Sequence, residues 1–114
     1  EIEAELKAED VNLKNAEMLE AFEPFGVDNP KPKLLLSDLV IKDQKLVGKE
    51  QKHLQLSLVS ETGKLLKAIA FGFGKSAPDL LPGQKIDIVF EMIKDEWNGL
   101  SNVKLRIIDY KKRI

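Results

Sequence analysis

The sequence predicts a mainly β protein: five strands that close a barrel, a short helix between the third and fourth strands, and one helix that precedes the barrel. Three observations carry this prediction. After residue 32, apolar residues recur at every second position in several segments, which is the spacing of strands with one buried face. Turn-forming Gly, Pro and Asn residues separate these segments. Between Asn12 and Pro24, by contrast, apolar residues recur at helical spacing.

The first predicted element is this N-terminal helix. Asn12 is a good N-cap, and Pro24 marks the end because proline disfavours the helical conformation in the residue before it. One face of the helix is apolar and comprises Leu13, Ala16, Leu19 and Phe22. Since a helix this short is marginal in water by itself, we expect Leu19 and Phe22 to pack on the barrel.

A connector follows the helix. Residues 24–32 contain three prolines, one glycine and the pair Asp28-Asn29, all of which favour turns. This composition predicts a rigid segment. It divides the chain into an acidic helix with its connector, residues 1–32, and a barrel, residues 33–114.

The barrel strands are predicted from alternating hydrophobicity. In the segment around residues 52–60, Leu54 and Leu56 face one side, while His53 and Gln55 face the other. The same spacing predicts strands over residues 33–47, 52–60, 65–71, 84–93 and 100–110.

Turns and one further helix indicate the topology. Asn98-Gly99 is a strong signal for a hairpin between the last two strands. Residues 72–81 break the β pattern, and we expect a short helix there from about Ser76. Five strands with a helix between the third and fourth are typical of the OB-fold, a Greek-key barrel. An SH3-like barrel is the main alternative, although it does not usually hold a helix at this position.

Composition excludes several classes of chemistry. The 114 residues hold no cysteine and one histidine, which excludes disulfides, thiolate metal sites and paired-histidine zinc sites. No acidic cluster is spaced for a metal ion, and no catalytic residues stand out. No apolar run approaches the roughly 18–20 residues of a membrane span, so we expect no membrane partner and a cytoplasmic location. A binding module fits better than a self-contained enzyme.

The net charge of −1 is unevenly distributed. Residues 1–23 carry two Lys against eight Asp and Glu, a charge of −6. Residues 24–114 carry sixteen Lys and Arg against eleven Asp and Glu, a charge of +5. Because electrostatic fields are screened within about 10 Å at 0.1 M salt, the basic barrel can still bind a polyanion.

Several segments resemble the C-terminal OB domain of RecJ, a single-strand-specific 5′→3′ DNA exonuclease. The most specific is Pro-Phe-Gly-Val-Asp-Asn-Pro-Lys-Pro at residues 24–32, which resembles the family's Pro-Phe-Gly-x-Gly-Asn-Pro-x-Pro except that Asp28 replaces a glycine. The family's second and third strands and its final hairpin resemble residues 53–56, 68–72, 96–99 and 105–109. Lys104 stands where a glutamine is common in the family, and the resemblance spans residues 13–110.

This resemblance implies a function. The chain would be the non-catalytic OB module of a nuclease whose chemistry belongs to Asp-His-His phosphoesterase domains that need Mg or Mn. One histidine cannot form that motif, so neither catalysis nor a cofactor is expected in this chain. The implied partners are single-stranded DNA, the upstream phosphoesterase domains of the same protein and a single-strand-binding protein, in DNA repair and recombination.

The OB-fold also indicates where DNA would bind. OB-folds bind single strands on the face of strands two and three and between the loops that join strands one–two and four–five. Cations there neutralise phosphates, and an aromatic ring stacks on bases. We therefore predict a surface that comprises Lys49, Lys52, Trp97, Lys104 and Arg106. Two alternatives stay open: the ring of Trp97 covers the end of the barrel, or the cations merely solvate edge strands.

Three other aromatic side chains are assigned structural positions. His53 is expected to make a structural hydrogen bond rather than to contact a ligand. Phe71 is expected to pack in the core, and Phe73 to be partly exposed.

The alternative function is a structural or protein-docking module. Such a module would pack on the nuclease core or recruit a repair partner. Acidic residues 1–23 favour it, because their charge of −6 would repel DNA.

Overall fold

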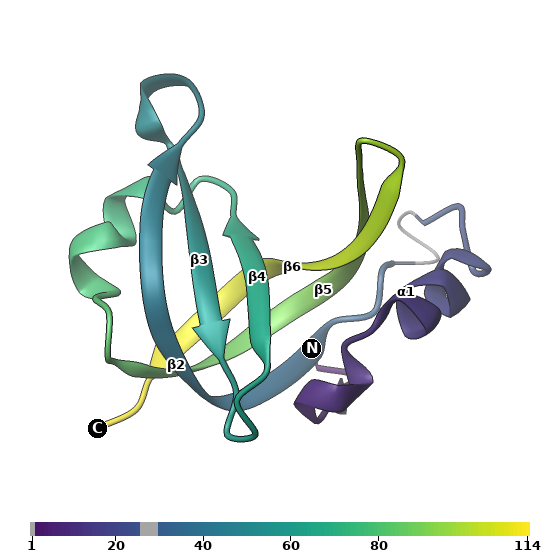
Figure 1. Ribbon diagram of the computed structural model, residues 1–114, viewed down its shortest axis with the longest axis horizontal. Helices are drawn as coiled ribbons and strands as arrows, with labels where there is room; N and C mark the ends of the chain where they lie inside the picture. Colours follow the sequence, from purple (N-terminus) through teal and green to yellow (C-terminus); the bar gives the residue numbers. More distant parts are fainter. Residues whose placement is uncertain (1, 26–29) are drawn as a thin grey trace.

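Five strands form the body of the molecule in the computed structural model, which describes residues 2–25 and 30–114 (Figure 1). They are β2 Leu34–Val47, β3 His53–Val59, β4 Leu65–Ala70, β5 Lys85–Trp97 and β6 Leu100–Lys112. The strands neighbour one another in the order β2-β3-β4-β6-β5, and β5 pairs back onto β2, which closes a barrel. The predicted mainly β OB-fold is confirmed.

Two features of the pairing produce this topology. The β4–β6 pair is parallel and joins Ala68 to Leu105, whereas the other barrel pairs are antiparallel. The long strand β2 serves two neighbours, β5 with its first half and β3 with its second half. Register shifts between Leu36 and Leu39 and between Ile41 and Asp43 interrupt it. Such irregularities bend a strand, so a single segment can turn from one side of the barrel to the other.

The core follows the predicted alternation. Leu54, Leu56 and Leu58 of β3 are buried, and so are Ile88 and Phe90 of β5. The 3-10 helix η3 (Gly74–Asp79) lies between β4 and β5, where the sequence predicted a short helix. The SH3-like alternative is therefore not supported.

The last hairpin is longer than predicted. β5 continues to Trp97 and β6 begins at Leu100, so Asn98 and Gly99 alone form the turn. Both turn residues have positive φ, 51° for Asn98 and 77° for Gly99, as a two-residue hairpin turn of this kind requires. The hairpin projects from the barrel on the side where α1 (Leu13–Glu20) lies (Figure 1).

The N-terminal segment packs directly on the barrel. Strand β1 (Ala4–Glu5) pairs in parallel with β2, and the 3-10 helix η1 (Ala8–Asp10) follows. The predicted N-cap of α1 is confirmed, because the Asn12 side chain accepts a hydrogen bond of 2.8 Å from the Asn15 backbone. Val11 and Ala16 join the barrel core, and Leu19 packs against it.

The prediction for Phe22 is wrong. Helix α1 ends at Glu20, short of Phe22, so helical spacing no longer places this residue on the buried face. Phe22 is 64% exposed, and Met18 is 58% exposed. The helix therefore packs through Ala16 and Leu19.

Asp28 and the turn expected around it lie outside the described residues. Among residues 2–25 and 30–114, no helix is long and apolar enough to span a membrane.

Candidate nucleic-acid interface

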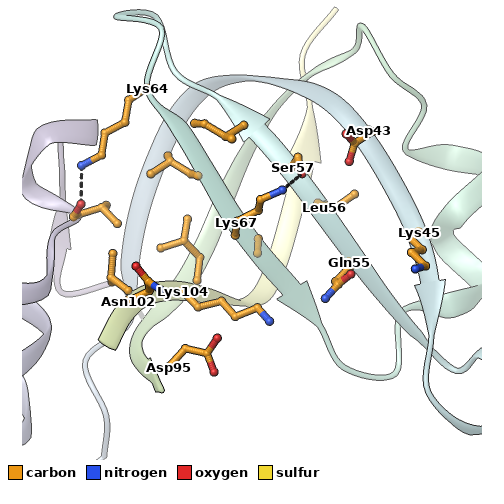
Figure 2. A pocket seen from close by; sticks show the side chains of 16 residues that line it. Asp43, Lys45, Gln55, Leu56, Ser57, Lys64, Lys67, Asp95, Asn102 and Lys104 are labelled. Atoms are coloured by element: carbon orange, nitrogen blue, oxygen red, sulfur yellow. Dashed lines mark hydrogen bonds between the residues drawn. The ribbon is translucent and has the colours of Figure 1, made fainter. Parts of the chain in front are cut away.

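A groove of about 590 Å³ runs across the outer face of β2, β3, β4 and β6 (Figure 2). Polar and charged side chains from these strands, from β5 and from the β3–β4 turn line it: Asp43, Lys45, Gln55, Ser57, Lys64, Lys67, Asp95, Asn102 and Lys104. The groove thus combines four lysines with two aspartates and several uncharged hydrogen-bonding groups.

Three of the four groove lysines are available to an anion. Lys67 donates a hydrogen bond of 2.9 Å to the Ser57 hydroxyl, a neutral partner that leaves its charge uncompensated. Lys45 is exposed and Lys104 is half-buried. Lys64 differs, because its ammonium donates to the Val11 carbonyl at 2.6 Å and the Ala8 carbonyl at 3.1 Å. The Lys64 ammonium group therefore binds the N-terminal segment and is not counted among the lysines available to an anion.

The sequence prediction missed most of this groove. Lys45, Gln55, Ser57 and Lys67 lie on strands rather than in the loops on which the prediction concentrated. A signal was present, because Lys67 alternates with the inward-facing Leu66 and Ala68 and must therefore point outward.

Arg106, a predicted site residue, follows Lys104 along β6 but lines a separate pocket with Glu91 and residues 23–25 and 30–31. Its guanidinium donates a hydrogen bond of 3.0 Å to Glu91, which is 7% exposed. The same guanidinium lies over the Phe71 ring, 5.8 Å from the ring centroid. Arg106 thus contacts Glu91 and Phe71 within the fold, while about half of its side chain stays exposed.

The prediction that Phe71 packs in the core is wrong, whereas Phe73 is partly exposed, as predicted. Phe71 is 50% exposed and lies directly after β4, which ends at Ala70. Gly72, with φ of 79°, then redirects the chain, and Phe73 packs against the core. β4 therefore ends at Ala70, one residue before the end of the strand that the sequence predicted.

His53 takes the structural role that the sequence predicted. Its Nδ1 accepts a hydrogen bond of 2.9 Å from the Gly72 backbone N–H. Its ring meets that of Phe71 at 78°, with centroids 5.3 Å apart. The imidazole therefore helps to hold Phe71 at the end of β4.

The other predicted site residues lie apart from the groove. Lys49 and Lys52 are on the exposed loop of η2 (Lys49–Gln51), where Lys52 forms an ion pair of 3.3 Å with Glu50. Trp97 is 71% exposed near the tip of the β5–β6 hairpin, so its ring does not cover the end of the barrel. Figure 1 shows the η2 loop and this hairpin at separate corners of the molecule. Of the five predicted residues, Lys104 alone lines the groove.

The acidic N-terminal segment is partly neutralised by the barrel. Lys94 of β5 lies 3.2 Å from Glu17 and 4.0 Å from Glu20, both on α1. The hydrogen bond with Glu17, helped by the charge of Glu20, raises the pKa of Lys94. Lys94 therefore pairs with α1, and its positive charge partly compensates the negative charge of Glu17 and Glu20.

No three His, Asp or Glu side chains among the described residues are grouped so that they could hold a metal ion.

Comparisons with known proteins connect this barrel to a family. The family described as RecJ OB domain matches residues 2–109. A curated relative, the single-stranded-DNA-specific exonuclease RecJ of Bacillus subtilis strain 168, is 29% identical over 109 residues, which are 96% of this chain and 14% of the relative. The chain therefore spans about one seventh of that protein's length.

Solved structures share the fold. RecJ of Thermus thermophilus in complex with Mn²⁺ is 23% identical, with a TM-score of 0.56 over 81% of this chain and 12% of that one. A putative aspartyl-tRNA synthetase of Leishmania major Friedlin is 11% identical, with a TM-score of 0.63 over 95% of this chain and 20% of that one. The resemblance to RecJ seen in the sequence thus agrees with the family match over nearly the whole chain, and this chain belongs to the RecJ OB domain family.

Proposed function

We propose that this chain is the single-stranded-DNA-binding OB module of a RecJ-like 5′→3′ exonuclease that acts in DNA repair and recombination. The single observation that carries the proposal is the groove whose lysines, Lys45, Lys67 and Lys104, lie on the outer face of β2, β4 and β6. This is the side of an OB barrel on which single strands bind. The name of the Bacillus subtilis relative, a single-stranded-DNA-specific exonuclease, supports the same substrate.

In this proposal the groove binds the sugar–phosphate backbone. The three lysines neutralise phosphates, while Gln55 and Asn102 donate hydrogen bonds to phosphate or sugar oxygens. The predicted residues outside the groove would contact other parts of the same strand: Lys49, Lys52 and Arg106 as further cations and Trp97 as a stacking platform. Because phosphate contacts and stacking carry little sequence information, binding should be independent of base sequence.

Catalysis would take place elsewhere in the parent protein. Phosphoesterase domains upstream of this module would hold Mg or Mn and cleave the strand that the module retains. Sharing one strand between two linked domains raises its effective concentration at each of them, so weak binding by the module alone can still matter. A cytoplasmic location and recruitment of a single-strand-binding protein belong to the same proposal.

The test is a salt-dependent titration of a labelled oligothymidylate followed by fluorescence anisotropy. The phosphates neutralised by Lys45, Lys67 and Lys104 contribute about −2 to the slope of log affinity against log salt, since each contributes about −0.7 for single strands, and contacts by Lys49, Lys52 or Arg106 would make the slope steeper. Replacing Lys67 and Lys104 together by Met should flatten this slope by about 1.4. Lys85→Met is the matched control, because Lys85 is exposed at the start of β5 and outside the groove. Binding that ignores salt, or that persists in the double variant with the wild-type slope, would contradict the proposal.

A docking module is the second candidate function. Exposed apolar side chains on α1 and on the β5–β6 hairpin favour it, since Met18 is 58% and Leu100 is 66% exposed. In that case the nuclease core, and not DNA, would change the fluorescence of Trp97, which is the only tryptophan and lies near the hairpin tip.

A further inference from the structure

Phe71 is an exposed aromatic ring whose neighbours are themselves anchored. It follows β4, and half of its surface is open to solvent. The Arg106 guanidinium lies over the ring at 5.8 Å, and the His53 ring lies 5.3 Å away at 78°. Arg106 of β6 and His53 of β3 thus both contact the Phe71 ring, which is only half buried.

Each of these neighbours is fixed by further contacts. Arg106 donates to the buried Glu91 at 3.0 Å. His53 accepts the Gly72 N–H at 2.9 Å and is also packed closely against Gly48. A Cβ on Gly48 would lie 2.6 Å from the His53 ring, and the φ of Gly48 is +82°. Both neighbours of the Phe71 ring are therefore connected to other parts of the barrel.

Phe71 also continues the surface that carries the groove. Lys67 of β4 lines the groove, Ile69 follows two residues later and is 6% exposed, and Phe71 lies directly after the strand. Ile69 pairs with Gln55 of β3 and with Arg106 of β6. A strand whose phosphates contact Lys67 would therefore have its next nucleotides beside Phe71.

From this arrangement we propose that Phe71, presented by Arg106 and His53, is a nucleobase-binding subsite that packs one base of the bound strand. The proposal rests on the proposed function and adds a subsite to it. An aromatic ring that is held in place loses little freedom when a base packs on it, and every base offers a π-face, so the subsite would not select among bases. The Arg106 guanidinium lies over one face of the ring, so the base would pack on the part of the ring that Arg106 leaves open.

The test moves the only tryptophan to the subsite. The double variant Trp97→Phe with Phe71→Trp reports base stacking at position 71 through its fluorescence. Titration at low salt with oligothymidylate should quench this fluorescence. An oligonucleotide of the same length in which abasic sugars replace every nucleoside, so that the phosphates remain, should leave it unchanged.

Affinity gives the second readout. Phe71→Leu keeps an apolar side chain but removes the ring, and should weaken oligothymidylate binding about 5- to 150-fold with an unchanged salt slope. Phe71→Leu should not alter binding of the abasic strand, and Phe71→Trp should bind oligothymidylate at least as well as the wild type. Leu81→Ala is the control for loss of an exposed apolar side chain, because Leu81 is 48% exposed and lies beyond η3. Thermal melting of each variant identifies effects on folding.

The outcomes separate this inference from the proposed function. Salt-dependent binding of oligothymidylate with silent fluorescence at position 71 and no effect of Phe71→Leu would overturn the subsite and leave the DNA-binding function intact. Absence of salt-dependent binding in the wild-type chain would overturn the proposed function and the subsite together.

Discussion

The pair of Arg106 and Glu91 predicts a cost in stability that is separate from any role in DNA binding. Glu91 is one of two polar or charged residues among the buried residues described, and its Oε1 accepts a hydrogen bond of 3.0 Å from Arg106. In Arg106→Met the carboxylate keeps its place on β5 but loses this partner. A buried charge without a partner is unfavourable, so the folded state should be destabilised.

The magnitude follows from the exposure of the two partners. Removing one partner of a fully buried ion pair costs about 3–5 kcal/mol, and leaving a buried polar group unpaired costs about 1–3 kcal/mol. The Glu91 side chain is 9% exposed but that of Arg106 is 47% exposed, so water can reach the carboxylate once the guanidinium is gone. We therefore expect a loss of about 1–2 kcal/mol in the free energy of unfolding. For a chain of this length, that corresponds to a decrease of roughly 4–8 °C in Tm.

Thermal melts and urea titrations at pH 7 test this expectation. Glu91→Gln with Arg106→Met removes the charge along with its partner, and the double variant should recover at least half of the loss, since a neutral amide is cheaper to bury than a carboxylate. The reasoning would be refuted if Arg106→Met melted at the wild-type temperature, or if the double variant were less stable than Arg106→Met. The same melts show whether an effect of Arg106→Met on DNA affinity comes from partial unfolding.

Three further predictions concern the core, the helix and pH. Phe90→Ala should lower the free energy of unfolding by about 3–5 kcal/mol in a urea titration, because this ring is 0% exposed in the centre of the barrel. Phe22→Ala should change it by less than about 1 kcal/mol, because Phe22 is 64% exposed, and a larger loss would mean that α1 packs through this ring. Hydrogen bonds from Lys112 (2.7 Å) and Tyr110 (3.0 Å) lower the pKa of Asp79 below its usual 3.8. A lowered pKa stabilises the fold above the unfolded-state pKa, so Asp79→Asn should melt below the wild type at pH 7, and the difference should shrink as the pH falls below about 4.

Local features of the sequence were sufficient to predict α1, the five barrel strands and the short helix between β4 and β5 in their order, but not β1, η1 or η2. Side chains alternate along a strand, so the spacing of Leu54, Leu56 and Leu58 predicted both the strand and its buried face. Asn98 and Gly99 accept positive φ, and this backbone preference predicted the hairpin turn. These properties depend on neighbours in the chain, which is why they could be read from the sequence.

The composition of the binding surface depended on tertiary structure instead. Lys104 reaches the groove beside Lys67 because β4 and β6 pair in parallel although they are far apart in the chain. Phe71 became an exposed ring because Gly72 redirects the chain directly after it, while Arg106, a residue from another strand, supports it. Which strands lie side by side is decided by closure of the whole barrel. Local spacing is enough to indicate which way Lys67 points, although the prediction did not use it, while the closed fold determined which side chains share its groove.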